Sequence, residues 1–386
     1  MKRLVSARCR IALLGFGTVG SAVARRLASA ARDFQLTHVL DRRAAVKRAA
    51  LTAPGVAWTT RIEDVLESDA DIVVEAIGGL DPAADWIRAA LLAGKSVVTA
   101  NKQVMARHGA VLRPLAARQG RQLRFEAAVG GAMPIVRAIA DGLAGDRITS
   151  IEAILNGTTN AVLSRMEARG CSMDEALADA RALGLAEADP SADLDGDDAA
   201  AKLAILCALA FGLHVDPVQI DVRSSAGVTS RDLARAHAAG ATVRQLAHAA
   251  FDRSTSTLTA CVAPATVPAG SIFATTVGPR NAAIITGEHS GETVLCGTGA
   301  GGDATAVAVL SDLAAIASDR AAIVPAPMLS SNFVIRSSDL ERTKNEERRT
   351  TNEEPRTTSE ECRTTNEKPR TTNDMDQQTF SLAEAV

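Results

Sequence analysis

The segment RIALLGFGTVGSAVARRLASAARD, residues 10–33, decides the fold of this chain. A short apolar run is followed by three glycines spaced G-x-G-x-x-G, and then by an amphipathic stretch that predicts a helix beginning near Thr18. In a turn between a strand and a helix, the first two glycines allow a pyrophosphate to approach the helix N–H groups, and the third lets the helix pack on the strand. The segment therefore predicts a dinucleotide-binding turn made of Gly15, Phe16, Gly17, Thr18, Val19 and Gly20.

An acidic residue stands where the next strand is expected to end. Asp41 follows Gly20 by 21 positions, and a carboxylate at this place would bond the ribose 2′-hydroxyl of NAD. Arg42 and Arg43 come directly after it and could hold the 2′-phosphate of NADP instead. The sequence predicts a nicotinamide dinucleotide and leaves NAD and NADP both open.

Short apolar strands alternate with amphipathic helices from residue 10 to about residue 130, which predicts a parallel sheet with helices on its faces. The strands DIVVEAIGG and KSVVTANK lead into Ile77, Gly78 and Lys102. We expect these residues in the crevice beyond the carboxyl ends of the strands, where ligands bind in such folds. On position alone, Lys102 could also be a solvated lysine at the start of a helix. The predicted fold is a Rossmann-type α/β domain over residues 1–135.

The pattern of predicted secondary structure changes from about residue 150, where strands mix with long alanine-rich helical stretches. This predicts a second, mixed α/β domain over residues 136–340, with part of its C-terminal end packing back on the first domain. Beyond it, a seven-residue repeat of the type RTTNEEP runs from 342 to 374 without apolar positions. Because such a repeat cannot form a coiled coil or bury surface, we expect residues 341–386 to be a disordered tail.

The overall composition excludes several classes of protein. Apolar residues make up 47% of the chain and the net charge is −3, as in ordinary globular proteins. Aromatic residues are only 3%, which argues against stacking platforms for nucleic acid, and no apolar run is long enough for a signal peptide or a membrane span. The six cysteines include no C-x-x-C pair. We therefore expect a soluble, cytoplasmic protein with neither a nucleic-acid nor a membrane partner.

One lysine stands in an unusual place. Within GLAEADPSADLDGDDAAAKLAILCALAFGL, residues 184–213, every residue from 199 onward is apolar or glycine except Lys202, so this helix should be buried. Lysine is rarely buried unless it is paired. Asp198 lies four positions earlier on the same helical face, and Asp195 about one turn further back. The segment predicts a buried Asp198–Lys202 pair.

Such a pair could carry chemistry or serve only as a salt bridge at a helix start. Desolvation disfavours the ammonium form of lysine and moves its pKa toward neutrality, which suits proton exchange with a substrate oxygen. Glu187 and Asp189, in a loop punctuated by glycine and proline, could bring another carboxylate to the same place. The chemistry of the residues favours a functional cluster.

Eight ordered motifs together resemble the homoserine dehydrogenase family and span nearly all of the chain before the repeats. They are GFGTVG, AIGG, TANK, FEAAVGGAMPIV, ILNGTTN, GLAEADPSADLDGDDAAAKLAIL, GTGAGG and SNFVIR. The resemblance implies reversible NAD- or NADP-dependent reduction of L-aspartate 4-semialdehyde to L-homoserine, a small-molecule substrate. It also implies a homodimer formed through the second domain.

The resemblance assigns roles to individual residues. It makes Lys202 the proton donor and acceptor for the terminal oxygen of the substrate, and Lys102 a second lysine that contacts substrate and cofactor. Asp198 would orient Lys202 or the substrate, and Glu187 would hold the substrate's amino group. The other implied contacts are Gly157 and Thr158 beside the substrate and Gly301 closing over the cofactor.

The family also places a monovalent cation, Na⁺ or K⁺, in the FEAAVGGAM segment. The implied ligands are Glu126, Val129, Gly131 and Met133, largely through backbone carbonyls. Because backbone ligands are a weak test of side-chain identity, the segment could equally be a plain turn between the domains.

Some positions depart from the family pattern. Asp197 and Ala200 replace a tyrosine-like and a histidine-like residue, and Asp303 and Ala304 replace a hydrophobic residue and proline. Many members continue after the SNFVIR strand into a threonine-sensing domain, which we do not expect here, so we expect no threonine inhibition through it.

Two rival functions are considered. Aspartate-semialdehyde dehydrogenase needs a nucleophilic cysteine, and no cysteine lies in a persuasive loop. A cofactor-sensing protein that has lost catalysis would not require Lys202 and Glu187, both of which are present.

Overall fold

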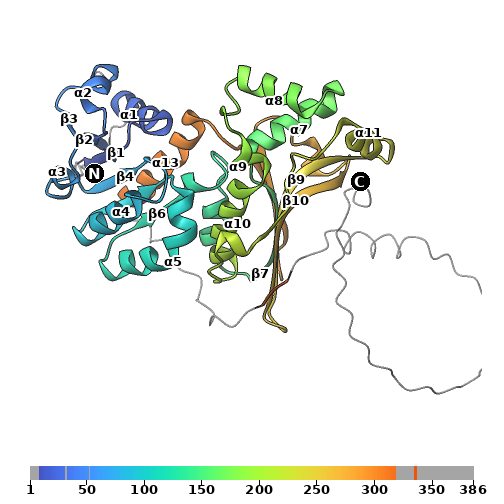
Figure 1. Cartoon of the computed structure of the whole chain (residues 1–386). Coiled ribbons are helices and arrows are strands. Elements are labelled where there is room, and N and C mark those ends of the chain that lie inside the picture. The colour runs from blue at the N-terminus through green and yellow to red at the C-terminus, as the bar shows by residue number, and fades with distance from the viewer. Residues whose placement is uncertain (1–7, 31–32, 52, 319–333, 337–386) are drawn as a thin grey trace, which may run out of the picture.

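The computed structural model describes residues 8–30, 33–51, 53–318 and 334–336 (Figure 1). The predicted tail, 341–386, and the place where a threonine-sensing domain would follow lie outside the described residues. In the part of the chain that is described, no helix is long and apolar enough to cross a membrane.

Six parallel strands form the first sheet, in the order β3-β2-β1-β4-β5-β6. Their bounds are β1 Cys9–Leu14, β2 Phe34–Leu40, β3 Ala57–Thr59, β4 Ile72–Glu75, β5 Ser96–Thr99 and β6 Leu123–Arg124. All residues of β4 and β5 are buried, as expected of strands covered by helices on both faces. This strand order is that of the doubly wound dinucleotide-binding fold, so the predicted fold class is confirmed, and its crevice opens between β1 and β4.

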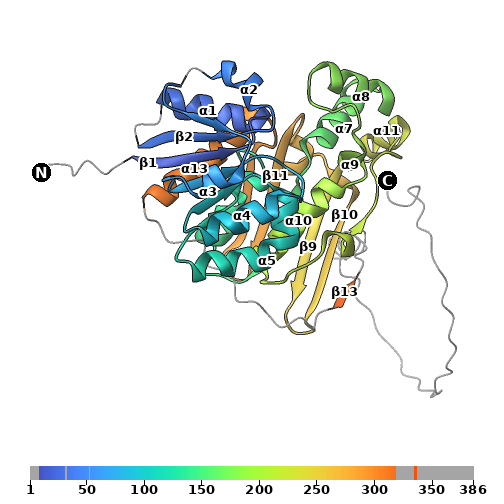
Figure 2. The same cartoon turned by 60° about the vertical axis from the view of Figure 1, so that its left-hand side comes forward.

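Helices cover this sheet, and the first of them begins at Thr18 as predicted. They are α1 Thr18–Ala30, α2 Ala44–Lys47, η1 Arg48–Ala50, α3 Ile62–Leu66, α4 Ala83–Leu92 and α5 Lys102–Arg118. A late helix, α13 Gly302–Ala317, returns to this half and lies beside α1 in both views (Figures 1 and 2). Its Val309 and Leu313 are fully buried in one cluster with Ile11 and Leu13 of β1, so α13 completes the core of the first half.

The second sheet is mixed, with the order β12-β11-β7-β9-β10-β13 and with β8 beside β10. Its strands are β7 Ile148–Ile154, β8 Asp221–Val222, β9 Ala241–Asp252, β10 Thr257–Pro268, β11 Arg280–Gly287, β12 Gly291–Thr298 and β13 Val334–Arg336. β10 pairs in parallel with β8 and with β13, which belongs to the SNFVIR motif, and the remaining pairs are antiparallel. The predicted mixed α/β texture of this half is confirmed.

Shorter helices connect and cover the second sheet. They are η2 Glu126–Ala128, α6 Ile135–Arg137, η3 Ala138–Gly142, α7 Gly157–Arg169, α8 Met173–Ala182, α9 Ser191–Leu194, α10 Asp197–Ala210, η4 Pro217–Gln219, α11 Ser230–Ala238 and α12 Ile272–Thr275. Helix α10 is the segment predicted to be buried, and ten of its 14 residues are buried.

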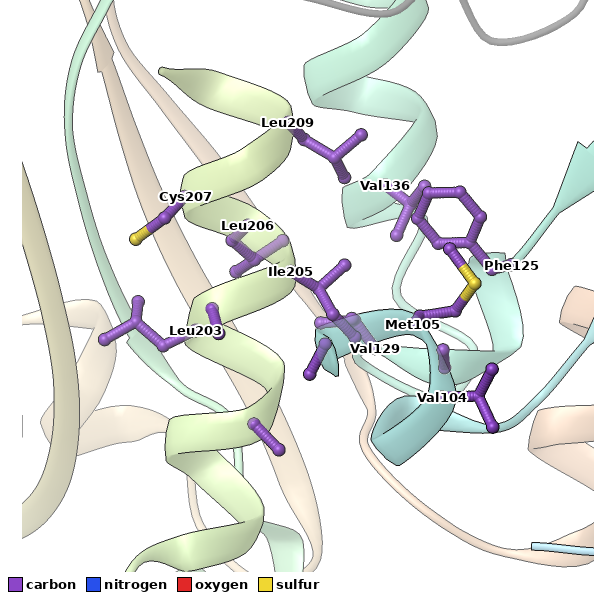
Figure 3. Packing of buried hydrophobic residues seen from close by; sticks show 14 of the residues in the cluster. Val104, Met105, Phe125, Val129, Val136, Leu203, Ile205, Leu206, Cys207 and Leu209 are labelled. Atoms are coloured by element: carbon purple, nitrogen blue, oxygen red, sulfur yellow. The ribbon is translucent and has the colours of Figure 1, made fainter. Parts of the chain in front are cut away.

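Helix α10 packs on α5 and so joins the two halves (Figure 3). Ile205 and Leu209 of α10 belong to the same buried cluster as Val104 and Met105 of α5. Each of these four side chains is at most 6% exposed, and burying a side chain of this size contributes about 1.5–3 kcal/mol. This packing fixes the first turn of α5, which carries Lys102, against the first turns of α10, which carry Asp198 and Lys202.

Candidate active site

One buried carboxylate bridges the two predicted lysines. The Nζ of Lys202 donates to Oδ2 of Asp198 at 2.7 Å, and the Nζ of Lys102 lies 2.5 Å from Oδ1. The side chain of Asp198 is 7% exposed, that of Lys202 12% and that of Lys102 38%. Lys202 also donates to the backbone oxygen of Leu155 at 2.8 Å. The predicted Asp198–Lys202 pair is present, and Lys102, from the other half of the molecule, joins it.

The electrostatics of this cluster favour full ionisation of Asp198. Burial alone would raise the pKa of the Asp198 carboxyl, but the charges of Lys202 and Lys102 outweigh burial and hold the pKa well below its usual range. For Lys102, burial acts to lower the pKa, but Asp198, with smaller contributions from Asp193 and Glu187, raises it above the ordinary value. Lys102 is therefore a fixed positive charge at neutral pH.

Local structure accounts for the position of each lysine. Asn101 caps α5 by accepting the Val104 N–H at 3.1 Å, so Lys102 is the first residue of that helix. Gly196 precedes α10 with φ at +93°, and a Cβ there would lie 2.8 Å from Cγ1 of Val222. Only glycine suits both that backbone conformation and that spacing.

Among the other predicted acids, Glu187 is close enough for its charge to act on Lys102. It is exposed and contributes to raising the pKa of Lys102. Asp195 does not continue the face of α10, because the helix begins after Gly196, and Asp195 accepts instead from Ser224 Oγ at 2.7 Å. Asp189 caps the following turn by accepting the Ser191 N–H at 3.1 Å.

Two residues of this cluster, Asn156 and Asp193, were not predicted. Asn156 is 3% exposed and donates through Nδ2 to Asp193 at 2.7 Å and to Asp198 at 2.8 Å. Both residues lie inside motifs quoted above. Their positions in the sequence give no sign that a residue just before α7 contacts carboxylates of α9 and α10.

The start of α7 borders the cluster. Gly157 follows Asn156 directly, and a Cβ there would lie 3.1 Å from the backbone oxygen of Pro279. Thr158 donates through Oγ1 to the backbone oxygen of Leu185 at 3.0 Å, in the loop that leads to Glu187. Thr158 therefore contacts the loop that leads to Glu187, and Gly157 adjoins Asn156, which bonds Asp198.

The glycine-rich turn fits a dinucleotide. Gly15 has φ at +93°, and a Cβ on it would lie 2.7 Å from the oxygen of Ala76, whereas a Cβ on Gly20 would lie 2.0 Å from the oxygen of Gly15. A Cβ on Gly17 would meet nothing within 4 Å. The first and third glycines are therefore needed for packing, and the second leaves open space beside the first turn of α1, where a pyrophosphate can bind.

Asp41, directly after β2, is already engaged. Its Oδ2 accepts from the Phe16 N–H at 2.9 Å and from Lys47 Nζ at 2.6 Å, and its Oδ1 accepts from the Arg43 N–H at 2.8 Å. Burial would raise the pKa of this carboxyl, but these donors, Lys47 first, lower it. Arg42 and Arg43 are exposed. Lys47 was not predicted, and its partnership with Asp41 depends on the turn into α2.

A second buried acid, Glu75, organises the loop after β4. It is fully buried and accepts from the N–H groups of Ile77 at 2.8 Å and Gly78 at 3.3 Å. It also accepts from the hydroxyl of Thr99 and, at 3.5 Å, from Asn101, which caps α5. Glu75 thus links the predicted Ile77–Gly78 loop to the turn that carries Lys102. Glu75 could not be predicted, because an acid at the end of a strand has no partner at helical spacing in the sequence.

The GTGAGG segment brings α13 against the glycine-rich turn. A Cβ on Gly302 would lie 2.9 Å from Cγ2 of Thr18, and the neighbouring Gly301 has φ at +116°. Asp303, one of the departures from the family pattern, pairs with Arg26 of α1 at 3.3 Å. Gly301 is therefore near the predicted cofactor turn, and Asp303 supports the contact between the two helices.

The segment proposed for a cation is a buried loop. Glu126, Val129, Gly131 and Met133 are all buried, and a Cβ on Gly131 would lie 2.5 Å from the oxygen of Gly299. The Glu126 side chain accepts from the N–H groups of Val136 and Arg137, each at 2.9 Å, while burial raises the pKa of its carboxyl to about 7. Across the described residues, no group of three or more His, Cys, Asp or Glu side chains could hold a metal ion.

The remaining departures lie in α10. Asp197 is the exposed first residue of the helix, so the additional acid beside Asp198 faces solvent. Ala200 is 1% exposed and is part of the core.

Comparison with known proteins gives consistent results for both halves. A family model described as homoserine dehydrogenase, NAD binding domain, matches residues 15–126, and one described as homoserine dehydrogenase matches residues 134–314. The homoserine dehydrogenase of Mycobacterium tuberculosis is 40% identical over 319 residues, which cover 80% of this chain and 72% of that protein. The Bacillus subtilis homoserine dehydrogenase is 36% identical over 319 residues, with the same coverage.

Solved structures agree with the sequence comparisons. A homoserine dehydrogenase from Thiobacillus denitrificans is similar with a TM-score of 0.79 and 33% identity, over 85% of this chain and 80% of that one. A hyperthermophilic archaeal homoserine dehydrogenase in complex with NADPH is similar with a TM-score of 0.70 and 27% identity, over 82% of this chain and all of that one.

Proposed function

Because the chain belongs to the homoserine dehydrogenase family, we propose that it reversibly reduces L-aspartate 4-semialdehyde to L-homoserine with a nicotinamide dinucleotide. The observation that carries the proposal is the pair of lysines that share Asp198 where the cofactor-binding half meets the second half. We place the reaction in the biosynthesis of threonine, methionine and isoleucine, as the resemblance implies.

A nicotinamide dinucleotide held at the turn from Gly15 to Gly20 would supply the hydride for the aldehyde carbon. Lys202 donates a proton from Nζ to the aldehyde oxygen as it becomes a hydroxyl, and takes the proton back in the oxidative direction. Asp198 accepts a hydrogen bond from Lys202 and keeps the ammonium group oriented. Lys102 holds a second positive charge beside the oxygen on which negative charge develops.

Selectivity for an α-amino acid comes from the rim of the site. Glu187 is exposed and near Lys102, so its carboxylate is available to bind the substrate's ammonium group. Gly157 and Thr158, at the start of α7, border the space between Glu187 and the lysines. An aldehyde without the amino group should therefore react with a higher KM.

Replacing Lys202 with methionine tests the proposal and separates it from the cofactor-sensing alternative. Lys202→Met should fold and bind cofactor, but lose about 100-fold or more in turnover, the usual contribution of a general acid. The assay follows nicotinamide absorbance after addition of aspartate semialdehyde.

Lys95→Met is the matched control. Lys95 is also a buried lysine, but it precedes β5, whereas Lys102 follows the other end of that strand, and it donates to the backbone oxygens of Ser68 and Ala70. The Lys95→Met variant should be less stable than the wild type but should keep the wild-type turnover per folded molecule. Normal turnover by Lys202→Met, or an inactive wild-type protein that still binds NADPH, would contradict the proposal.

We propose further that NADP is the preferred cofactor. Both oxygens of Asp41 are engaged within the protein, and Lys47 neutralises its charge. Arg42 and Arg43 add exposed positive charge beside it. A ribose 2′-hydroxyl would have to compete with Lys47 for the carboxylate, whereas a 2′-phosphate gains from the cationic surroundings.

The ratio of kcat/KM for NADP to kcat/KM for NAD tests this preference. Lys47→Ala and Arg42→Ala should each lower the ratio by about tenfold, the usual effect of one charge-assisted hydrogen bond. Arg88→Ala removes an exposed charge from α4 of the same half and should leave the ratio unchanged. A wild-type preference for NAD that Lys47→Ala does not alter would refute the assignment.

The loop from Glu126 to Met133 is proposed to hold Na⁺ or K⁺ through backbone carbonyls, with Val129 and Gly131 as the other ligands. Hard cations take oxygen ligands of this kind. The oxygens of Glu126 and Met133 each accept one backbone N–H and retain a second lone pair, so the loop is compatible with a cation. The melting temperature should be higher in sodium or potassium chloride than in choline chloride of equal ionic strength. Equal melting temperatures would exclude a cation that supports the loop.

We propose that the chain forms a homodimer through its second sheet. Half-buried side chains such as Ile284 and Thr286 of β11 and His248 of β9 alternate along their strands with fully buried ones. Light scattering on the eluted protein should give twice the mass of one chain. A cytoplasmic location is proposed because Cys9, Cys171, Cys207 and Cys296 are free thiols, which persist in reducing compartments.

A further inference from the structure

Asn156 is the residue through which two carboxylates of the site are held together. Its Oδ1 accepts the Thr159 N–H at 2.8 Å and so caps α7. Its Nδ2 donates to Oδ1 of Asp193 at 2.7 Å and to Oδ2 of Asp198 at 2.8 Å. The side chain is only 3% exposed, so each of these contacts is made away from water.

The surroundings permit only one orientation of this amide. Rotating it by half a turn would put its oxygen against the two carboxylates and its NH₂ group against the Thr159 N–H. Both contacts would then be repulsive. The side chain is therefore fixed by the cap of α7, and its two N–H groups are aimed at α9 and α10.

Asp198 is held from three sides as a result. Its Oδ2 accepts from Asn156 and Lys202, and its Oδ1 faces Lys102. Asn156 is the neutral member of this set, and a neutral N–H donor at Oδ2 favours the ionised form of Asp198 without adding charge.

We propose that Asn156 is a positioning residue, which fixes the Asp198 carboxylate in the orientation that presents Lys202 and Lys102 to the substrate. The inference rests on the proposed roles of the two lysines. It predicts that loss of the two N–H donors lowers turnover and makes Asp198 easier to protonate, while the dinucleotide still binds normally at the other half.

Two replacements keep the helix cap and remove the donors. Serine is as good an N-cap as asparagine, but it cannot donate to both carboxylates. Aspartate keeps the shape and the capping oxygen and adds a negative charge beside Asp193 and Asp198. Ser172→Ala is the matched control, because it removes the cap of the adjoining helix α8, where Ser172 accepts the Glu175 N–H, without touching the carboxylates.

The expected result is graded. Asn156→Ser should lose about tenfold or more in kcat, the usual effect of removing a hydrogen bond to a charged group, with the KM for NADPH within about twofold of wild type. The acidic limb of the pH profile of kcat/KM should move to higher pH in Asn156→Ser and further in Asn156→Asp. Ser172→Ala should change the melting temperature only.

Assaying Lys202→Met in parallel distinguishes a failure of the proposed function from a failure of the positioning role of Asn156. If Lys202→Met stays active, the proposed function fails. If Lys202→Met is inactive while a folded Asn156 variant keeps the wild-type kcat and pH profile, the positioning role alone is overturned. Since both Ser and Asp retain the cap, the Asp variant supplies the same test should the Ser variant not fold.

Discussion

Lys102, the first residue of α5, lies 2.5 Å from Oδ1 of Asp198 in the first turn of α10. One partner belongs to the dinucleotide-binding half and the other to the half with the mixed sheet, so the cluster forms only when the two halves are packed together. The buried contact between α5 and α10 holds that arrangement (Figure 3). Stability of the packed core and assembly of the site are therefore coupled.

Asp198→Asn should be destabilising as well as inactivating. Removing the charge leaves the Lys202 ammonium, with a side chain only 12% exposed, without a counterion. Breaking a buried pair in this way costs roughly 3 kcal/mol, at the low end of the usual range because Lys102 retains access to water. Urea unfolding followed by circular dichroism measures the difference.

The exposed pair between Asp303 and Arg26 provides the contrast. Asp303→Asn removes an ion pair whose aspartate side chain is 74% exposed, and it should change stability by less than about 1 kcal/mol. Equal losses in Asp198→Asn and Asp303→Asn would show that the buried cluster contributes nothing beyond a surface pair.

The sequence predicted features that depend on short spacing. The strand, the glycine-rich turn and the whole of α1 follow one another within 22 residues, from Cys9 to Ala30, so periodicity and turn chemistry were sufficient. The Asp198–Lys202 pair needed only the four-residue spacing of a helix and the apolar character of its surroundings. These local rules failed at Asp195, because Gly196, with positive φ, precedes the helix and the helix begins only at Asp197.

Contacts between distant segments could not be predicted in the same way. Asn156 meets Asp193 and Asp198 only because α7, α9 and α10 pack together, and Glu75 meets Asn101 because β4 and β5 are neighbours. The partnership of Lys47 with Asp41 depends on the turn into α2. Each is a tertiary contact between groups that are ordinary in their own segments.

Alanine substitutions in the glycine-rich turn should distinguish a glycine needed for packing from one needed for cofactor binding. Gly20→Ala would place a Cβ 2.0 Å from the backbone oxygen of Gly15, which cannot move without displacing β1. We expect it to cost about 3 kcal/mol or more, at the upper end of the usual cost of overpacking. Thermal unfolding of the purified variant measures the effect.

Gly17→Ala is the counterpart on the same turn. Its Cβ meets nothing within 4 Å, so the fold should be unaffected, but the methyl group occupies space that a pyrophosphate needs. We expect a wild-type melting temperature. The dissociation constant for NADPH should rise by about tenfold or more, measured by the fluorescence of the bound nicotinamide. Unchanged affinity would place the pyrophosphate elsewhere.

Cysteine reactivity should follow burial. Cys207 lies within α10, and burial raises the pKa of its thiol to about 12. Cys296 of β12 is exposed, and its sulfur accepts from Arg280 at 3.2 Å. Because the thiolate is the reactive form, brief treatment of the native protein with iodoacetamide at mildly alkaline pH should modify Cys296 and spare Cys207. Peptide mass spectrometry identifies the modified residues.

Denaturation supplies the control for that experiment. In urea the two thiols should react at similar rates, since the difference arises from burial in the folded state. Native alkylation of Cys207 as fast as Cys296 would mean that α10 opens readily, contrary to its central position in the core.

Stability should decrease in mild acid partly because of His248 on β9. Burial lowers the pKa of this imidazole below its ordinary value of 6.5, so the folded state binds the proton less readily than the unfolded state. The contribution of His248 is therefore fully present above about pH 6.5 and is lost as the pH falls through the lowered pKa.

His248→Asn removes the titration. Its free energy of unfolding should fall less than that of the wild type between about pH 7 and about pH 5, measured by urea unfolding at constant ionic strength. Parallel pH dependences of the two proteins would show that His248 is equally easy to protonate in both states.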